Sequence, residues 1–316
     1  MLSTIENTRP LSSVTTSANR LEDQVGNTPL IRLWNTAVAH HIPNTVAIYA
    51  KAEWFNPSGS VKDRAALNII RTAEENGQLK PGMTLLDSTS GNMGIAYAML
   101  GAARGYQIKL TLPSNASPER IAILKAYGAE LILTDPLEGS DGAILVAREL
   151  AAADPTLYYA NQYNNSANWQ AHTKTTAPEI WQQTDGQITH FVAGLGTSGT
   201  FTGTTRRLKQ FNPNISTVAM QPDGPFHGLE GLKHMPSALK PGIYDEGVPD
   251  EQVTVRTEDA HKMAHFLARN EGLFVGISAA AAVVASLNVA KTLDEGVVVT
   301  ILPDNGFKYL SDTLWQ

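Results

Sequence analysis

The chain has 316 residues, a length that predicts two domains at ~150 residues each. Hydrophobic residues make up 42% and charged residues 17%, the balance of an ordinary globular protein with a sizeable core. The formal net charge of -6, without any basic block, argues against nucleic acid as the main partner. No cysteine is present, which excludes disulfides, thiolate metal sites and a cysteine nucleophile.

The N-terminal segment and the longest apolar run bear on where the protein works. Residues 1–19 are polar and rich in Ser and Thr, and they lack the apolar core of a signal peptide. The longest apolar run, residues 279–287, is too short to span a membrane. We therefore expect a cytoplasmic protein without a membrane partner, with a loose N-terminal arm over residues 1–20.

Candidate strands and helices alternate along the chain after a short strand at residues 30–33. This alternation predicts an α/β protein with parallel sheets. Residues 222–250 are rich in Gly and Pro and show little periodicity, so we expect a long loop near the site there. The expected strands are 46–50, 84–87, 107–112, 130–133, 157–160, 189–193, 217–221 and 297–302, and the expected helices begin near residues 62, 92, 117, 140, 168, 200, 258 and 277.

Residues 56–64 follow the strand at 46–50 and combine chain breakers with a helix start. A Pro and a Gly interrupt the chain, and Ser60 with Asp63 three residues later resembles a capping box. Lys62 therefore lies in the first turn of a helix, where unpaired backbone amides carry a partial positive charge. That field favours a neutral amine able to form an imine, although a first-turn lysine more often points into water.

The loop Thr89–Gly94 lies between a strand and a helix. Its small hydroxyl residues, Thr89 and Ser90, leave backbone amides free to receive an anion at the helix N-terminus, and a carboxylate suits that place. The alternative is a plain strand-to-helix turn without a ligand.

The stretch Gly194–Thr200 follows an apolar strand, opens a helix and matches G-x-G-x-x-G. One interpretation is a dinucleotide-binding turn, which needs an acidic residue ~20 positions later, and Asp223 lies near that position. The other is a cup for a single phosphate, because the hydroxyls of Thr197, Ser198 and Thr200 add to the helix amides and match a dianion. The motif alone leaves both open.

The segment Asn56–Arg64 reads Asn-Pro-Ser-Gly-Ser-Val-Lys-Asp-Arg and closely resembles the cofactor-lysine motif of the cysteine synthase family. This family contains O-acetylserine sulfhydrylases and cystathionine β-synthases, which are fold-type II enzymes that use pyridoxal phosphate. The resemblance extends from residue 26 to residue 311. It implies that Lys62 is the Schiff-base lysine and that pyridoxal 5'-phosphate is the cofactor.

The resemblance also implies the fold and its domains. Fold-type II enzymes are similar to the tryptophan synthase β subunit and have two open, twisted, mostly parallel sheets flanked by helices. Residues 46–153 would form a smaller domain with the lysine and the substrate-carboxylate loop. Residues 21–45 together with 154–316 would form a larger domain with the phosphate cup.

Matching positions in the family's motifs imply roles for the other site residues. The family's Gly-Thr-Ser-Gly-Thr cup binds the cofactor phosphate, and its Thr-Ser-Gly-Asn-Thr-Gly loop binds the substrate carboxylate. Met93 departs from the usual Thr, so only its backbone amide is kept for that carboxylate. The implied residues are Gly196, Thr197, Ser198, Gly199 and Thr200 for the phosphate, Asn92 for the ring hydroxyl, Ser278 for the ring nitrogen, and Thr89, Ser90, Met93 and Gln162 for the carboxylate.

The reaction implied by the resemblance is β-replacement on an activated serine, either O-acetylserine or O-phosphoserine. Lys62 would remove the Cα proton, the β-substituent would leave to give an α-aminoacrylate, and sulfide or thiosulfate would add to make cysteine or S-sulfocysteine. Lys233 and His234 stand where the family's B isozyme has a pair of Arg residues, so the chain resembles the B type. Cations there would favour a substrate with extra negative charge.

Several alternatives share parts of this site. Cystathionine β-synthase uses the same residues with homocysteine, threonine deaminase-like lyases stop at elimination, and an NAD-dependent oxidoreductase would use the turn at Gly194. A catalytically idle binding protein is a further alternative, because cysteine synthases can dock the tail of a serine acetyltransferase. By resemblance we expect a homodimer. His261 and His265 lack the Glu of H-E-x-x-H, so no metal is expected.

Overall fold

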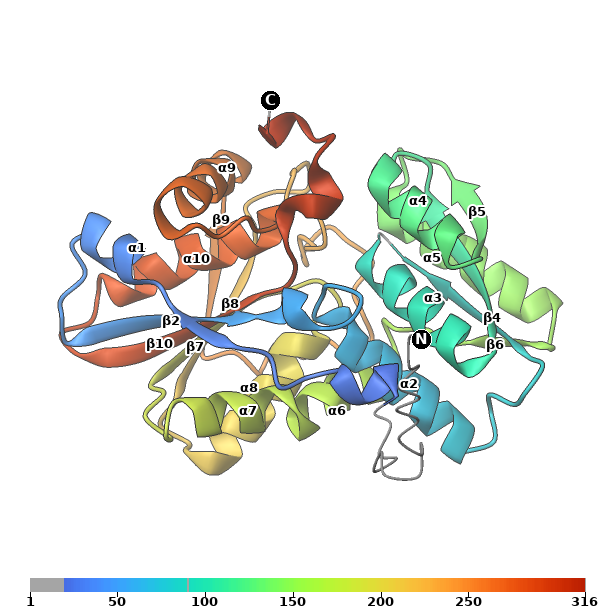
Figure 1. Cartoon of the computed structure of the whole chain (residues 1–316), viewed down its shortest axis with the longest axis horizontal. Helices are drawn as coiled ribbons and strands as arrows, with labels where there is room; N and C mark the ends of the chain where they lie inside the picture. Colours follow the sequence, from blue (N-terminus) through green and yellow to red (C-terminus); the bar gives the residue numbers. More distant parts are fainter. Residues whose placement is uncertain (1–19, 90, 316) are drawn as a thin grey trace, which may run out of the picture.

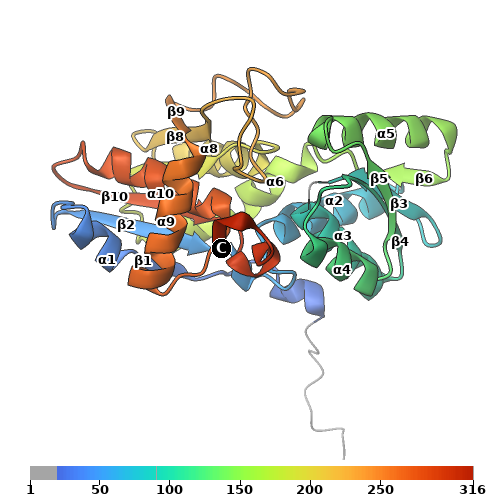
Figure 2. The ribbon, with the colours of Figure 1, turned by 90° about the horizontal axis from the view of Figure 1, so that it is seen from above.

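The computed structural model describes residues 20–89 and 91–315, and its strands form two separate sheets (Figures 1 and 2). The larger sheet has the order β1-β2-β10-β7-β8-β9, and its neighbouring strands are parallel except β1 and β2. The smaller sheet has the order β5-β4-β3-β6 and is parallel throughout. The strands are β1 (Leu30–Arg32), β2 (Val46–Ala52), β3 (Thr84–Ser88), β4 (Gln107–Pro113), β5 (Glu130–Thr134), β6 (Leu157–Tyr159), β7 (His190–Gly194), β8 (Ser216–Pro222), β9 (Glu251–Val255) and β10 (Gly296–Leu302).

Helices flank both sheets, so the predicted α/β architecture with two mostly parallel sheets is confirmed. In Figure 1, α9 and α10 lie on one face of the larger sheet and α6, α7 and α8 on the other. The helices are α1 (Trp34–Ala39), α2 (Lys62–Glu75), α3 (Asn92–Arg104), α4 (Pro118–Ala126), α5 (Gly139–Ala153), α6 (Ala167–Lys174), α7 (Thr176–Gln183), α8 (Gly199–Phe211), α9 (Thr257–Phe266) and α10 (Ile277–Ala290). Short 3₁₀ turns occur at Leu21–Gln24, Glu53–Phe55 (η3), Gly306–Tyr309 (η5) and Thr313–Trp315, and a π turn at Leu267–Glu271.

Buried apolar side chains form three clusters between helices and sheets. One joins α9 and α10 to the larger sheet, the second joins α7 and α8 to its opposite face, and the third fills the smaller sheet against α2 and α3. Val298 and Val299, neighbours in β10, belong to the first and second clusters respectively. Successive strand residues point to opposite faces, so an unbroken apolar run is what a strand covered on both sides requires.

The strands and helices predicted from hydrophobic patterns are present, with ends shifted by a few residues. The structure adds α1, α7 and β9, which were not predicted. Between β8 and β9, residues 223–250 contain neither helix nor strand, which confirms the long loop. The expected N-terminal arm falls outside the described residues except for Arg20.

Two strands lie on the other side of the predicted domain boundaries. β2 begins at residue 46 but pairs with β1 and β10 in the larger sheet. β6 begins at residue 157 but pairs with β3 in the smaller sheet. The boundaries near residues 46 and 154 are therefore each wrong by one strand. Pairing depends on partners far along the chain, which local patterns do not identify.

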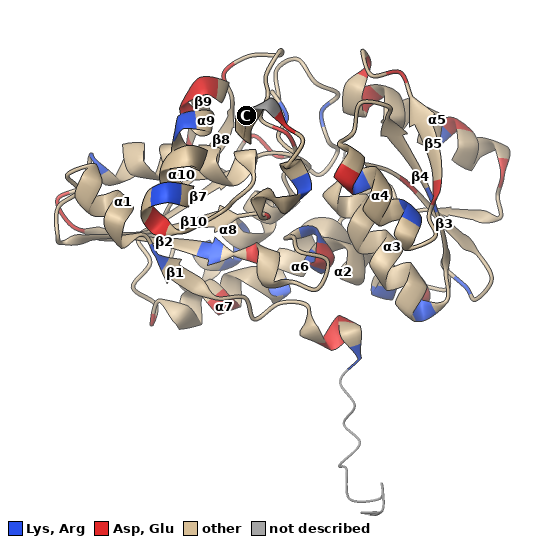
Figure 3. Ribbon diagram, turned by 45° about the horizontal axis from the view of Figure 1, so that its top comes forward, with Lys and Arg blue, Asp and Glu red and all other residues tan. Residues whose placement is uncertain are grey.

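The distribution of charged residues and the length of the helices are relevant to nucleic-acid and membrane binding. Acidic and basic residues are interspersed along the ribbon in both parts of the molecule (Figure 3). Among the described residues, none of the helices combines the length and apolar character needed to cross a bilayer.

Candidate active site

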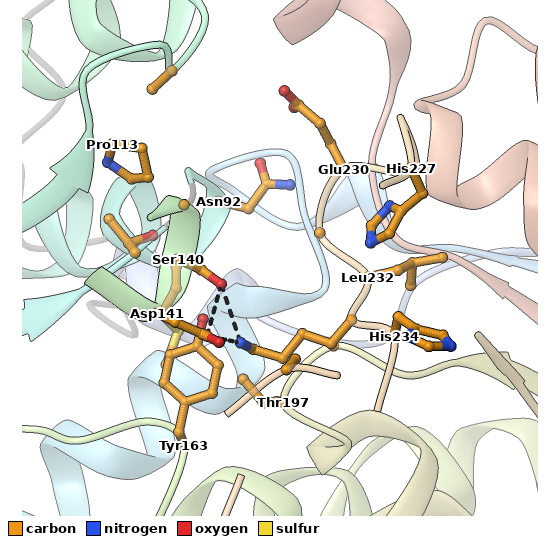
Figure 4. A pocket seen from close by; sticks show the side chains of 18 of the residues that line it. Asn92, Pro113, Ser140, Asp141, Tyr163, Thr197, His227, Glu230, Leu232 and His234 are labelled. Atoms are coloured by element: carbon orange, nitrogen blue, oxygen red, sulfur yellow. Dashed lines mark hydrogen bonds and ion pairs between the residues drawn. The ribbon is translucent and has the colours of Figure 1, made fainter. Parts of the chain in front are cut away.

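Two adjoining cavities lie where the helices of the two sheets meet. The wider one, of about 500 Å³, is lined by the starts of α3 and α5 and by the loop at 223–250 (Figure 4). The narrower one follows the N-terminus of α8 and reaches the start of α10. Lys62, Asn92 and Thr197 line both cavities. Every predicted site residue within the described ranges lines at least one of them, and Ser90 lies outside those ranges.

Lys62 is the first residue of α2, as predicted. Burial lowers the pKa of its amine from the ordinary 10.5 to about 8. The predicted capping box is absent, because Val61 is the N-cap residue and makes no side-chain bond. Asp63 instead accepts hydrogen bonds from the Ser58 backbone amide (2.7 Å) and the Ser58 hydroxyl. These bonds brace the loop that leads to Lys62.

The N-terminus of α8 forms a tight cup. A Cβ at Gly196 would lie 2.3 Å from a backbone carbonyl oxygen of the long loop. A Cβ at Gly199 would lie 2.0 Å from Asn168 Oδ1, so neither glycine has room for a side chain. Ser198 adopts a φ of 69°, and its buried hydroxyl has no hydrogen-bond partner in the described part of the chain. An unpartnered hydroxyl at a helix N-terminus fits a phosphate monoester.

Two buried side chains behind the cup were not predicted. Asn168 Nδ2 donates to the Gln162 carbonyl oxygen (2.8 Å) and to Thr197 Oγ1 (3.2 Å). His172 is buried with its Nε2 3.2 Å from Thr200 Oγ1, and burial lowers its pKa, so the ring is neutral. Both lie on α6 four residues apart, a spacing that could have indicated a shared helix face.

The loop between β3 and α3 folds around Thr89. Its Oγ1 accepts hydrogen bonds from the amides of Gly91 (2.9 Å) and Gly94 (3.1 Å). Gln162 comes from the far end of β6, and its Nε2 donates to the carbonyl oxygen at the end of β3 (2.6 Å). Met93 is buried in the first turn of α3 and lines the wider cavity. Thr89, Met93 and Gln162, which the sequence predicted to act together, therefore line one cavity at the α3 N-terminus.

Asn92 and Ser278 lie at the starts of two helices, α3 and α10, that border the narrower cavity. The amide of Asn92 contacts Asp304 (2.7 Å) and Lys308 (2.8 Å). Ser278 is buried. Asp304 and Lys308 were not predicted, because more than 200 residues separate them from Asn92 and no local pattern marks them.

The predicted cation at the cavity mouth carries a counter-ion. Lys233 is buried, with its Nζ 2.5 Å from Asp141 Oδ1 and 3.1 Å from Ser140 Oγ. Figure 4 shows Ser140 and Asp141 on one side of the cavity and His227 and His234 on the other. A buried ammonium needs such a partner, so Lys233 does not present the free charge that the sequence suggested.

Known proteins resemble this chain over most of its length. A family model described as a pyridoxal-phosphate dependent enzyme matches residues 21–304. The chain is 53% identical over 297 residues to cysteine synthase of Aquifex aeolicus, covering 92% of this chain and 90% of that one. It is 43% identical over 291 residues to cysteine synthase B of Escherichia coli, covering 92% and 94% respectively. The crystal structure of cysteine synthase from Entamoeba histolytica matches with a TM-score of 0.89 and 36% identity, covering 99% of this chain and 94% of that chain.

These likenesses also decide between the two interpretations of the turn at Gly194–Thr200. A family that uses pyridoxal phosphate binds a single phosphate, which favours the phosphate cup over the dinucleotide-binding turn. The dinucleotide interpretation is therefore set aside. The chain belongs to the family of pyridoxal-phosphate-dependent enzymes, within its cysteine synthase group.

Proposed function

We propose that this protein is a cysteine synthase, which replaces the β-substituent of O-acetylserine by a sulfur nucleophile with pyridoxal phosphate as its cofactor. The observation that carries the proposal is the meeting, in one cavity, of an amine of lowered pKa, Lys62, with an anion cup at the N-terminus of α8. The identity to named cysteine synthases supports the same reaction.

The residues around the narrower cavity have the donors that this cofactor needs. The first amides of α8 and the hydroxyls of Ser198 and Thr200 would hold the phosphate, with neutral His172 behind them. Asn92 would donate to the ring oxygen, and Ser278 would bond the ring nitrogen. Bound there, pyridoxal phosphate supplies an electron-withdrawing ring that acidifies the Cα–H of an amino acid. A serine hydroxyl does not hold the ring nitrogen protonated, which suits loss of a good leaving group from Cβ.

Lys62 serves two purposes in this proposal. Its pKa of about 8 leaves part of the amine uncharged near neutral pH, so it would be able to condense with the carbonyl carbon of the cofactor with loss of water. The same amine, when free, removes the proton from Cα and returns it after the sulfur has added. The Asp63–Ser58 bonds hold the preceding loop, which limits how far the amine moves between these positions.

The substrate carboxylate would lie at the N-terminus of α3. Thr89, Met93 and Gln162 line the wider cavity at this helix start, and the helix field favours an anion there. Met93 would contribute its backbone amide only, since a thioether does not donate a hydrogen bond. Ser90 completes the set in this proposal by its place in the loop.

The cavity mouth determines which leaving groups and nucleophiles are accepted. We assign O-phosphoserine and thiosulfate as further substrates beside O-acetylserine and sulfide, through His234 and Lys233. His234 is half-buried and lines the cavity. Lys233 would contribute its charge when its ion pair with Asp141 opens.

The family resemblance extends this proposal to the cellular compartment, the oligomeric state and a partner protein. The protein would work in the cytoplasm as a homodimer. A serine acetyltransferase would dock its tail at the cavity mouth, where Leu137 and Phe226 are almost fully exposed.

The proposal is tested by competition between nucleophiles on the purified protein with pyridoxal phosphate and O-acetylserine. Sulfide, thiosulfate and homocysteine are supplied together, and the products are separated by mass spectrometry. We expect cysteine and S-sulfocysteine, and neither product from Lys62→Ala. Cystathionine as the main product, or no product with any of the three, would contradict the proposal.

A further inference from the structure

Lys308 is a buried lysine that lines neither cavity. It belongs to η5 near the end of the chain and is 6% exposed. Its Nζ donates three hydrogen bonds, to the carbonyl oxygens of Ser58 (3.0 Å) and Gly59 (3.2 Å) and to Asn92 Oδ1 (2.8 Å). One ammonium therefore joins the loop that leads to Lys62 with the amide at the start of α3.

Asp304 contacts the same amide from its nitrogen side. The carboxylate is fully buried, and its Oδ2 receives a hydrogen bond from Asn92 Nδ2 (2.7 Å) and another from the Tyr309 hydroxyl (2.6 Å). Asp304 and Lys308 both come from the segment after β10, so one short stretch of chain holds both ends of the Asn92 amide.

This arrangement fixes which way the amide points. An ammonium can only donate, so the atom beside Lys308 must be the amide oxygen. The carboxylate accepts, so the atom beside Asp304 must be the amide nitrogen. Turning the amide over would place its NH₂ against the ammonium and its oxygen against the carboxylate. Because Oδ1 and one N–H are used, Asn92 keeps one N–H as its remaining donor.

We infer that Lys308 and Asp304 are positioning residues that make Asn92 a hydrogen-bond donor toward the cavity. The site then selects a ligand oxygen that accepts, which in the cofactor is the deprotonated ring oxygen. The inference rests on the proposed function, in which Asn92 faces that oxygen. Lys308 lines neither cavity and acts through Asn92.

The test is a double-mutant cycle between Lys308 and Asn92, read as binding of pyridoxal phosphate to apoprotein. Lys308→Met should raise the Kd about tenfold, because a charge-assisted hydrogen bond to Asn92 is lost. It should also move the pH at which the absorbance of bound cofactor changes upward, since the ionised ring oxygen loses its donor. In an Asn92→Ala background the same substitution should change neither quantity. Lys308→Arg keeps a positive donor, so it should preserve most of the affinity for pyridoxal phosphate. Lys240→Met, at an exposed lysine of the long loop, should change neither the Kd nor the pH of the absorbance change.

The outcomes separate this inference from the proposed function. If the unsubstituted apoprotein does not bind pyridoxal phosphate, the proposed function is wrong. If it binds and Lys308→Met shifts neither Kd nor spectrum, or shifts them equally with and without Asn92, the inference is wrong while the function stands. Should Lys308→Met fail to fold, Asp304→Asn enters the same cycle. Its neutral amide is a weaker acceptor for Asn92 Nδ2 than the carboxylate, so it loosens the hold on Asn92 while Lys308 still fixes the amide oxygen, and a smaller rise in Kd is expected.

Discussion

Lys62 is the residue whose chemistry depends most on its surroundings. Burial disfavours the ammonium, so the neutral amine prevails above about pH 8 rather than above its ordinary 10.5. We expect the rate at which apoprotein captures pyridoxal phosphate to rise with pH and to level off above about 8. Borohydride reduction at timed intervals, followed by peptide mass spectrometry, measures capture at Lys62. A capture rate that keeps rising up to pH 10 would mean that burial does not lower the pKa of the Lys62 amine.

Substitution of the same lysine tests its identity. Lys62→Ala removes the amine at the start of α2, so we expect no borohydride-stable link between cofactor and protein. Noncovalent binding should remain, because the α8 cup is unchanged. A link that persists in Lys62→Ala would assign the attachment to another lysine.

Gly199 tests the cup itself. A Cβ there would lie 2.0 Å from Asn168 Oδ1, so Gly199→Ala must push Asn168 or the α8 N-terminus aside. Overpacking of this kind costs about 1–3 kcal/mol, which corresponds to a Kd for pyridoxal phosphate raised about tenfold to a hundredfold. Gly224→Ala is the matched control, because its Cβ would meet nothing within 4 Å. Equal cofactor affinity in the two variants would show that the cup tolerates a side chain.

At the scale of elements, a buried charge network fixes the start of α2. Arg64 forms ion pairs with Glu53 of η3 (2.7 Å) and Glu179 of α7 (2.6 Å). Lys51 of β2 also pairs with Glu179 (2.7 Å). Burial alone would raise the pKa of Glu179, but the hydrogen bonds and charges of Arg64 and Lys51 hold it at about 2. The network therefore ties α2, the helix that carries Lys62, to η3 and to α7, and it ties α7 to β2.

The network predicts a pH-dependent loss of stability. A carboxyl with a depressed pKa stabilises the fold above its unfolded value near 4.5 and loses that contribution as the pH falls toward 2. Glu179→Gln should lower the free energy of unfolding by roughly 3 kcal/mol at pH 7, and the difference should shrink below pH 4.5. Urea unfolding at several pH values measures it. Glu246→Gln, in an exposed pair, should cost far less; a pH-independent difference for Glu179→Gln would contradict the argument.

The sequence predicts the long apolar elements and misses several short ones. α10 and the inner strands are buried runs that local patterns identify well. α1 has only six residues, and β9 is an edge strand with mostly exposed side chains, so neither carries a clear period. The same limit applies to the site. Motifs singled out Lys62 and the turn before α8, but the partners of Arg64 and Asn92 come from distant segments.

At the scale of the whole molecule, two ion pairs cross the wider cavity. Lys233 of the long loop pairs with Asp141 at the start of α5, and Glu230 of the same loop pairs with Arg120 of α4 (both 2.5 Å). The loop extends from the larger sheet, whereas α4 and α5 belong to the smaller one. The pairs therefore link the two parts of the molecule beside the wider cavity. The family resemblance implied that Lys233 binds substrate charge. Its partner Asp141 lies 92 residues away in the sequence, so the resemblance did not predict the ion pair.

Removing the negative partner should uncover the charge of Lys233. In the unsubstituted protein the Leu239 amide donates to Asp141 Oδ2 (2.7 Å). Asp141→Asn keeps an oxygen that can accept this hydrogen bond, but it no longer neutralises the Lys233 ammonium. A dianionic nucleophile gains more from that ammonium than a singly charged one, by about the 1.5–3 kcal/mol of a charge-assisted hydrogen bond. We therefore expect the kcat/KM ratio of thiosulfate to sulfide to rise about tenfold or more in Asp141→Asn. Steady-state kinetics with both nucleophiles measure the ratio.

Asp245→Asn, which removes an acid from the exposed pair with Arg206, controls for net charge and should leave the kcat/KM ratio unchanged. An equal change for both nucleophiles would show that the Asp141–Lys233 pair only holds the entrance closed and does not read substrate charge.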